Sequence, residues 1–156
     1  MKTTGHIERV GEVYKFIGFV NEATDFSAIL DEKGPIKLSL ETFAGMSSIG
    51  TRRFSDFVNA ASVEGLELYD CPSTFVQLIN IIPRLLGVPA NSQIVRSFYL
   101  PFDCTGCDYR TIQLVRRHDV TVEGTDIAVP RVYCKYEPEH RVASAVDLHD
   151  YLLFMM

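Results

Sequence analysis

The chain has 156 residues and a formal net charge of −5 at pH 7, and 47% of its residues are hydrophobic. This length fits one domain, and a charged fraction of 22% is ordinary for a globular protein. The acidic balance argues against a general nucleic-acid binder, because such a protein needs a basic face that replaces counterions.

The sequence shows no targeting or membrane-spanning segment. No stretch approaches the roughly 18 uncharged apolar residues of a transmembrane helix, and residues 1–13 hold no apolar core of signal-peptide length. We therefore expect a cytoplasmic protein without a membrane partner. In that compartment the four cysteines should stay reduced or bind a metal rather than form disulfides.

Two strands with a short helix between them are predicted in the first quarter of the chain. Residues 13–20 are rich in β-branched and aromatic side chains, as strands are. Thr24 or Asp25 can cap a short helix after them. Residues 36–41 alternate apolar and polar side chains, which predicts a half-buried strand.

Two amphipathic helices are predicted next. The first follows a loop at residues 44–50 and carries an apolar stripe at helical spacing, formed by Phe54, Phe57, Val58 and Ala61. A short strand at residues 66–69 leads to the second, which runs through residues 75–86 and should kink or break at Pro83. Residues 94–102 are predicted to form a further strand.

This order of strands and helices predicts an α/β fold, in which a mixed sheet of four or five strands carries at least two helices. We expect a single domain over residues 1–156, with its core in residues 10–100. Residues 101–156 differ, because strand-like runs flank Cys104-Thr105-Gly106-Cys107. A β-ribbon extension packed on the core is expected there.

The extension needs something to hold it, because a lone two-stranded ribbon is only marginally stable in water. A metal ion, a partner chain or packing on the core can each do so. The sequence favours packing, through an apolar set that consists of Ile112, Leu114, Val132, Leu148, Leu152 and Leu153.

Residues 38–54 resemble the STAS domain, the fold of anti-sigma-factor antagonists. They combine a strand, a short loop with Ser48-Ile49-Gly50 and a helix. Phe16-Ile17-Gly18-Phe19 is similar to the family's first strand, and residues 68–72 are similar to the end of its third. Residues 95–102 with the following Cys-x-x-Cys resemble bacterial STAS-like proteins that carry a cysteine-bearing ribbon. The resemblance covers roughly residues 10–140.

The resemblance implies a non-enzymatic regulatory module that docks a protein partner, either an anti-sigma factor or a related kinase-like regulator. Self-association into a homo-oligomer is a further candidate. The partner-binding loop would consist of Ser47, Ser48, Gly50 and Thr51, with phosphorylation of Ser48 as a switch. A helix N-terminus tolerates a phosphate.

This loop departs from the family pattern in two places. Ser47 stands where the family has Asp, and Ile49 stands at its second serine. Because serine is also a common N-cap, plain capping by Ser47 or Ser48 is the competing interpretation, and the sequence favours it.

Cys104, Cys107 and Cys134 are candidate zinc ligands. A Cys-x-x-Cys turn places two thiolates on one side, as tetrahedral zinc requires. The ribbon-bearing relatives usually have a second such pair, but here Glu137 stands at the place of its second cysteine, and we put it in the candidate set. His140 and His118 are alternatives for the fourth ligand. Free thiols in a vestigial ribbon are the competing interpretation, which the sequence slightly favours.

No enzyme motif is present, since the chain lacks a Gly-x-Ser-x-Gly elbow, a phosphate-binding glycine loop and a His-Glu-x-x-His pair. We therefore expect no enzyme. Two other functions stay open. One is binding of a small apolar ligand or lipid in a cavity lined by Phe16, Phe19, Phe54, Phe57 and Phe75, although core packing explains these rings more simply. The other is a structural zinc-binding protein.

Overall fold

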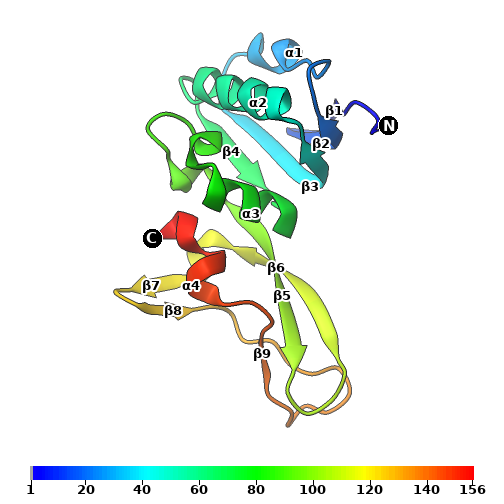
Figure 1. The fold of residues 1–156 in the computed structure, drawn as a ribbon, viewed down its shortest axis with the longest axis vertical. Coiled ribbons are helices and arrows are strands. Elements are labelled where there is room, and N and C mark those ends of the chain that lie inside the picture. The colour runs from blue at the N-terminus through cyan, green and yellow to red at the C-terminus, as the bar shows by residue number, and fades with distance from the viewer. Residues whose placement is uncertain (1) are drawn as a thin grey trace.

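The computed structural model describes residues 2–156 and shows a mixed α/β protein with a layered part and a β-ribbon below it (Figure 1). The layered part contains a four-stranded sheet in the order β1-β2-β3-β4. β1 and β2 are antiparallel, whereas β3 runs parallel to both β2 and β4. The predicted α/β fold with a mixed sheet is confirmed. The strand bounds are β1 His6–Val10, β2 Val13–Val20, β3 Ile36–Met46 and β4 Leu66–Tyr69.

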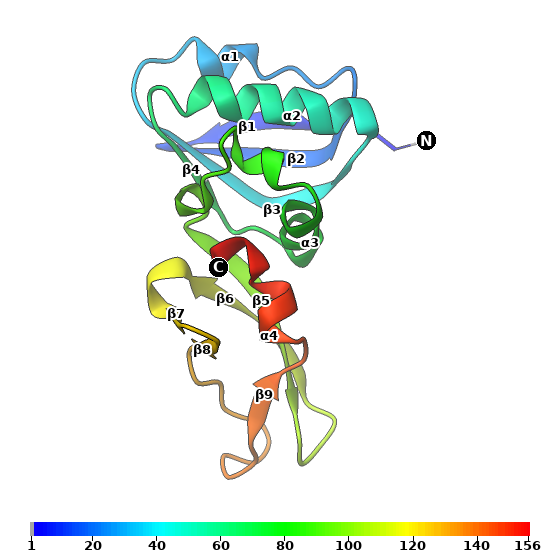
Figure 2. The ribbon, with the colours of Figure 1, turned by 60° about the vertical axis from the view of Figure 1, so that its left-hand side comes forward.

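Three helices belong to the layered part: α1 (Ser27–Leu30), α2 (Ser48–Ala61) and α3 (Ser73–Ile81). Figure 2 shows α2 lying over one face of the sheet, with α1 beside it. Both α2 and α3 contact β3. The apolar stripe of α2 therefore faces the sheet, and Phe54 and Val58 are fully buried.

Two features of the sheet differ from the sequence prediction. β1 was not predicted, because it is an edge strand whose residues are exposed except for half-buried Ile7, so it carries no apolar alternation. β3 continues to Met46, into the expected loop. The predicted break at Pro83 is confirmed, because α3 ends at Ile81 and Pro83–Leu86 forms a separate 3₁₀-helix.

The ribbon is a three-stranded antiparallel sheet in the order β6-β5-β9, formed by β5 (Ser97–Cys104), β6 (Arg110–Arg116) and β9 (Val142–Ser144). A small hairpin of β7 (Thr121–Glu123) and β8 (Asp126–Ala128) lies beside it. Isolated parallel bridges join Leu68 to Val95 and Cys71 to Phe98. β5 therefore starts next to β4 and continues into the ribbon, so that one strand joins the two parts.

The chain end returns to the layered part through α4 (Leu148–Tyr151). Leu152 is fully buried, and the Tyr151 hydroxyl donates to the Tyr99 carbonyl at 2.6 Å. Asn80 donates its side-chain amide to the Tyr151 carbonyl at 2.8 Å. The expected packing on the core is thus present at the C-terminal segment.

The expected packing is wrong for three residues of the apolar set. Ile112 is 63% exposed, Leu114 is 47% exposed and Leu153 is 54% exposed. Ile112 pairs with Pro101 and Leu114 with Tyr99, on the face of β5 opposite to its buried Phe and Leu side chains. Because side chains alternate along a strand, Val115 is the β6 residue that is buried. Val132 and Leu148 are partly buried against the core.

Within residues 2–156, no helix has both the length and the apolar character that crossing a bilayer requires.

Candidate metal centre

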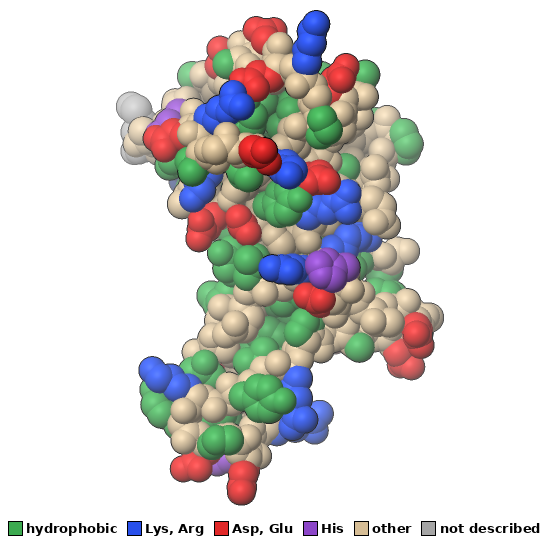
Figure 3. Space-filling model, turned by 180° about the vertical axis from the view of Figure 1, so that it is seen from behind, with side chains coloured by type: hydrophobic (Ala, Val, Ile, Leu, Met, Phe, Trp, Pro, Cys, Tyr) green, Lys and Arg blue, Asp and Glu red, His purple; other side chains and the backbone are tan. Residues whose placement is uncertain are grey.

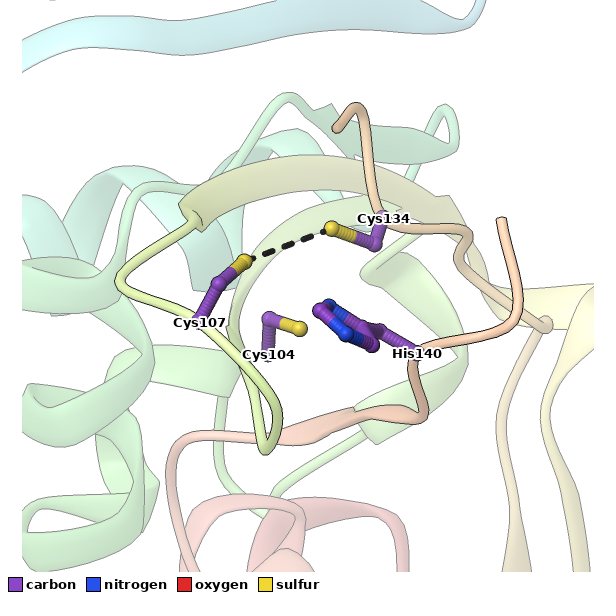
Figure 4. A group of neighbouring side chains, drawn as sticks. All are labelled: Cys104, Cys107, Cys134 and His140. Atoms are coloured by element: carbon purple, nitrogen blue, oxygen red, sulfur yellow. Dashed lines mark hydrogen bonds between the residues drawn. The ribbon is translucent and has the colours of Figure 1, made fainter. Parts of the chain in front are cut away.

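Four side chains converge at the far end of the ribbon (Figure 4). Cys104 is the last residue of β5, Cys107 lies in the turn before β6, and Cys134 and His140 lie between β8 and β9. One ligand atom from each of the four lies within 4.8 Å of all the others. The sulfurs of Cys107 and Cys134 are 3.5 Å apart. The cluster therefore joins two segments that are distant in sequence.

The first segment is a tight turn that the local sequence builds. The Cys104 backbone N–H donates to the Tyr109 carbonyl at 2.8 Å, and the Gly106 N–H lies 3.4 Å from the Cys104 sulfur. A Cβ at Gly106 would come within 2.7 Å of the His140 ring. Glycine is therefore the residue that lets the imidazole lie against this turn.

The second segment is a loop that is closed by backbone contacts. An antiparallel bridge joins Tyr133 to Arg141, and the Thr105 N–H donates to the Arg141 carbonyl at 2.9 Å. Pairing of β5 with β9 places Val142 opposite Cys104. These backbone hydrogen bonds hold both loops at one place and aim their side chains inward.

The surroundings of Cys134 and Cys107 shift their thiol pKa values in opposite directions. At Cys134 burial opposes ionisation, but hydrogen bonds from the backbone N–H groups of Glu137 and Tyr136 and from the Cys107 and Cys104 thiols outweigh it and lower its pKa to about 6. At Cys107 the Tyr109 backbone N–H favours the thiolate. Burial and the neighbouring cysteines are stronger there and raise its pKa to about 11.

His140 has an unsatisfied nitrogen. Its Nδ1 atom is buried and has no hydrogen-bond partner among the described residues. Buried polar atoms nearly always have a partner, so this nitrogen calls for an explanation. A lone pair of a neutral imidazole beside three sulfurs is the donor set of a zinc site.

The spacing of the sulfurs also fits a metal. Two sulfurs bound to one tetrahedral zinc, each at about 2.3 Å from it, are separated by about 3.8 Å. A disulfide would need about 2.0 Å. The observed 3.5 Å between Cys107 and Cys134 is close to the first value and far from the second. The residues present therefore fit a zinc ion bound by three cysteines and one histidine.

The structure brings together the three predicted cysteines but not the predicted Glu137. Glu137 is exposed, and its backbone N–H rather than its carboxylate approaches Cys134. His140 takes the fourth position, while His118 lies near Asp119 in the 3₁₀-turn that follows β6. The sequence signal for His140 is that it follows Cys134 with five residues between them, a spacing close to those of paired zinc ligands.

The predicted serine loop lies at the opposite end of the molecule from this cluster (Figure 1). Ser47 is the N-cap of α2, and its hydroxyl accepts the Gly50 N–H at 3.0 Å. Ser48 is the first helical residue and is exposed. Thr51 is buried and donates its hydroxyl to the Ser47 carbonyl at 2.9 Å.

Gly50 has a structural role in this loop. A Cβ at this position would lie 2.1 Å from the Val20 carbonyl oxygen. Glycine therefore allows the first turn of α2 to approach the end of β2. This explains Gly50 without a partner, and Ser48 is the member of the candidate set that stays available to one.

The aromatic residues proposed to line a ligand cavity pack against one another. Phe54 lies 5.6 Å from Phe75 and 5.9 Å from Phe57, measured between ring centroids. Phe26, which the sequence analysis did not include, stacks on Phe57 at 4.6 Å. Phe19 is half-buried. These contacts favour ordinary core packing.

No family model matches this chain, and neither the curated proteins nor the solved structures give a match. The resemblance to the STAS family stays a prediction, and the metal centre rests on its own geometry.

Proposed function

We propose that the chain is a structural zinc-binding protein, in which Cys104, Cys107, Cys134 and His140 hold one zinc ion. The observation that carries this proposal is the convergence of the four ligand atoms within 4.8 Å, one of them an unpartnered buried nitrogen. Structural zinc sites use four protein ligands and keep no open position. The ion would therefore stabilise the ribbon rather than catalyse a reaction.

The part of the ribbon that follows β5 would gain most from such an ion, because few of its residues are fully buried. Between Thr105 and Ala145, Val115 and Cys134 are the two buried residues. Hydrophobic burial is the main stabilising contribution in folding, and it is scarce in this segment. Zinc binding would supply folding free energy at the place where packing does not.

The donor set selects zinc over other metals. Calcium and magnesium require oxygen ligands, and iron–sulfur clusters of the common type require four cysteines. Three thiolates and an imidazole form one of the recurrent ligand sets of structural zinc.

The test is the metal content of the full chain, measured by elemental mass spectrometry after purification without chelators. We expect one zinc per chain, and Cys107→Ser should lose it. Cys71→Ala is the matched control, because Cys71 is fully buried in the core and burial raises its pKa. Zinc-free wild-type protein, a Cys107–Cys134 disulfide in it, or zinc retained by Cys107→Ser would contradict the proposal.

A second candidate function is a regulatory module of the cytoplasm that docks an anti-sigma factor or a kinase-like regulator. Its support is the exposed Ser48 at the start of α2, whose neighbour Ser47 already caps the helix. A phosphate on Ser48 would lie at the positive end of the helix dipole. Phosphosite mapping of protein from its native cell should find phosphate on Ser48 and none on Ser47. Phosphate found only on residues other than Ser48 would contradict this candidate function.

A further inference from the structure

A cleft lies between the layered part and the ribbon. Its volume is about 860 Å³, and it is lined by the end of β4, the start of β5 and the segment that follows β6. Sites for small molecules usually measure about 300–1,000 Å³. Figure 3 shows Lys, Arg and His side chains gathered near mid-height on the face turned away from the viewer in Figure 1. The cleft is far from the metal centre at the ribbon end.

The cleft is locally cationic on an acidic protein. The guanidinium groups of Arg96, Arg116 and Arg117 line it beside His118, whereas the chain as a whole carries a net charge of −5. These residues lie just before β5, at the end of β6 and in the following 3₁₀-turn. The fold therefore collects positive charge at one site.

Of the two carboxylates in the cleft, one pairs with Arg96 and neither pairs with Arg116 or Arg117. Glu67 binds Arg96 at 3.2 Å and also accepts the Tyr69 hydroxyl. Asp70 accepts the hydroxyl of Ser39 at 2.8 Å and that of Ser97 at 3.3 Å. Both carboxylates are engaged by neighbours other than Arg116 and Arg117.

Arg116 and Arg117 consequently have no anionic partner in residues 2–156, because none of the ion pairs there includes either residue. Arg116 is exposed. Arg117 is half-buried, and two of its N–H groups donate to the Ser92 carbonyl and hydroxyl at 2.8 and 3.3 Å. Burial and the nearby Arg96 lower its pKa. A partly buried guanidinium without a counter-charge is unfavourable, and an anion would relieve this cost.

The cleft also has apolar lining residues, which are Leu114, Val120, Val122 and Met155. The apolar side chain of Leu114 is 47% exposed there. An occupant that contacts both the arginines and these apolar residues would carry an anionic group and a flat or apolar group. Guanidinium groups match phosphate oxygens in pairs, which favours phosphate over a single carboxylate.

We infer that this cleft binds a small phosphate ester, with its phosphate at Arg116 and Arg117 and its apolar group at Leu114, Val120 and Val122. This inference is independent of the zinc ion and of the Ser48 loop. Free nucleotides and other phosphorylated small molecules share the chemistry that the cleft recognises.

The test is a titration of the full chain, as purified, with AMP, GMP, inorganic phosphate and adenosine. Binding is measured by calorimetry and by ¹H–¹⁵N NMR. We expect a nucleotide to shift the signals of residues 116–118 and 120–122. Adenosine should bind more weakly than AMP by about tenfold or more, because it lacks the phosphate that accepts hydrogen bonds from the charged guanidinium groups. Inorganic phosphate should perturb residues 116–118 alone.

Arg116→Gln is the diagnostic variant, because Arg116 is exposed and forms no ion pair within the described chain. It should weaken AMP binding by about tenfold or more while the melting temperature and zinc content stay unchanged. Arg110→Gln is the matched control. Arg110 lies at the far end of the same strand, and its substitution removes the same charge. It should bind AMP like the wild type.

Any one of the following results would overturn the inference. The first is no binding of either nucleotide at millimolar concentration. The second is adenosine binding as strongly as AMP, or equal AMP affinity in Arg116→Gln and the wild type. The third is a cleft that responds to a phosphorylated peptide and to neither nucleotide, which would assign the surface to a protein partner instead.

Discussion

Adjacent leucines at the chain end lie in opposite environments. Leu152 is fully buried in the core cluster, whereas Leu153 is 54% exposed. α4 ends at Tyr151, and the tight turn that follows directs neighbouring side chains to different sides. The anchoring of the C-terminal segment therefore depends on one residue of the pair.

We expect Leu152→Ala to lower the free energy of unfolding by about 2–5 kcal/mol, because it removes a buried side chain and leaves a cavity. Leu153→Ala is the control and should change it by less than about 0.5 kcal/mol. Urea unfolding of the two variants measures the difference. Equal losses would show that the C-terminal segment is not docked as described.

At the scale of elements, the two serines at the start of α2 differ in their hydrogen bonding. Ser47 accepts the Gly50 N–H, while Ser48 faces solvent in the first turn. The sequence left open which of the two serines caps the helix, because either lies at the correct distance from the apolar stripe. The structure assigns capping to Ser47, and the hydroxyl of Ser48 is left for other uses.

Ser47→Ala should therefore reduce the free energy of unfolding by about 0.5–2 kcal/mol, the usual cost of losing an N-cap. Ser48→Ala should change it by less than about 0.5 kcal/mol. Chemical denaturation of both variants under one condition is the measurement. A larger loss from Ser48→Ala than from Ser47→Ala would reverse the assignment of the cap.

At the scale of the whole molecule, the two parts depend on different forces. The layered part has a continuous hydrophobic core that includes Phe16, Leu40, Phe54 and Phe75, all fully buried. The far half of the ribbon has the Cys₃His cluster and little apolar burial. Removal of zinc should therefore affect the two parts unequally.

We expect a strong chelator to disorder residues 105–144 while the sheet β1–β4 and the helices α2 and α3 keep their structure. Amide NMR signals of the ribbon should broaden or collapse toward random-coil positions, and those of the layered part should stay dispersed. Added zinc should restore the spectrum. An unchanged ribbon spectrum after complete zinc removal would show that packing alone holds the ribbon, as the sequence analysis favoured.

The sequence alone determined the α/β class, the position of α2 and the candidate cysteines. These features follow from local information: the helical spacing of Phe54, Phe57 and Val58, and the Cys-x-x-Cys turn. Helix and strand periods and tight turns are properties of neighbouring residues, so they can be read without knowledge of the fold. The same locality explains why the edge strand β1 was missed, since its side chains carry no apolar pattern.

The tertiary structure alone decided which distant residues meet. It placed His140 rather than Glu137 beside the three cysteines, exposed Ile112 and Leu114, and gathered Arg96, Arg116 and Arg117 at one cleft. Each result depends on strand register or on the path of a loop, because a shift of one residue along β6 exchanges its buried and exposed faces. Spacing in the chain does not fix such long-range pairing, whereas backbone hydrogen bonding and burial in the folded state do.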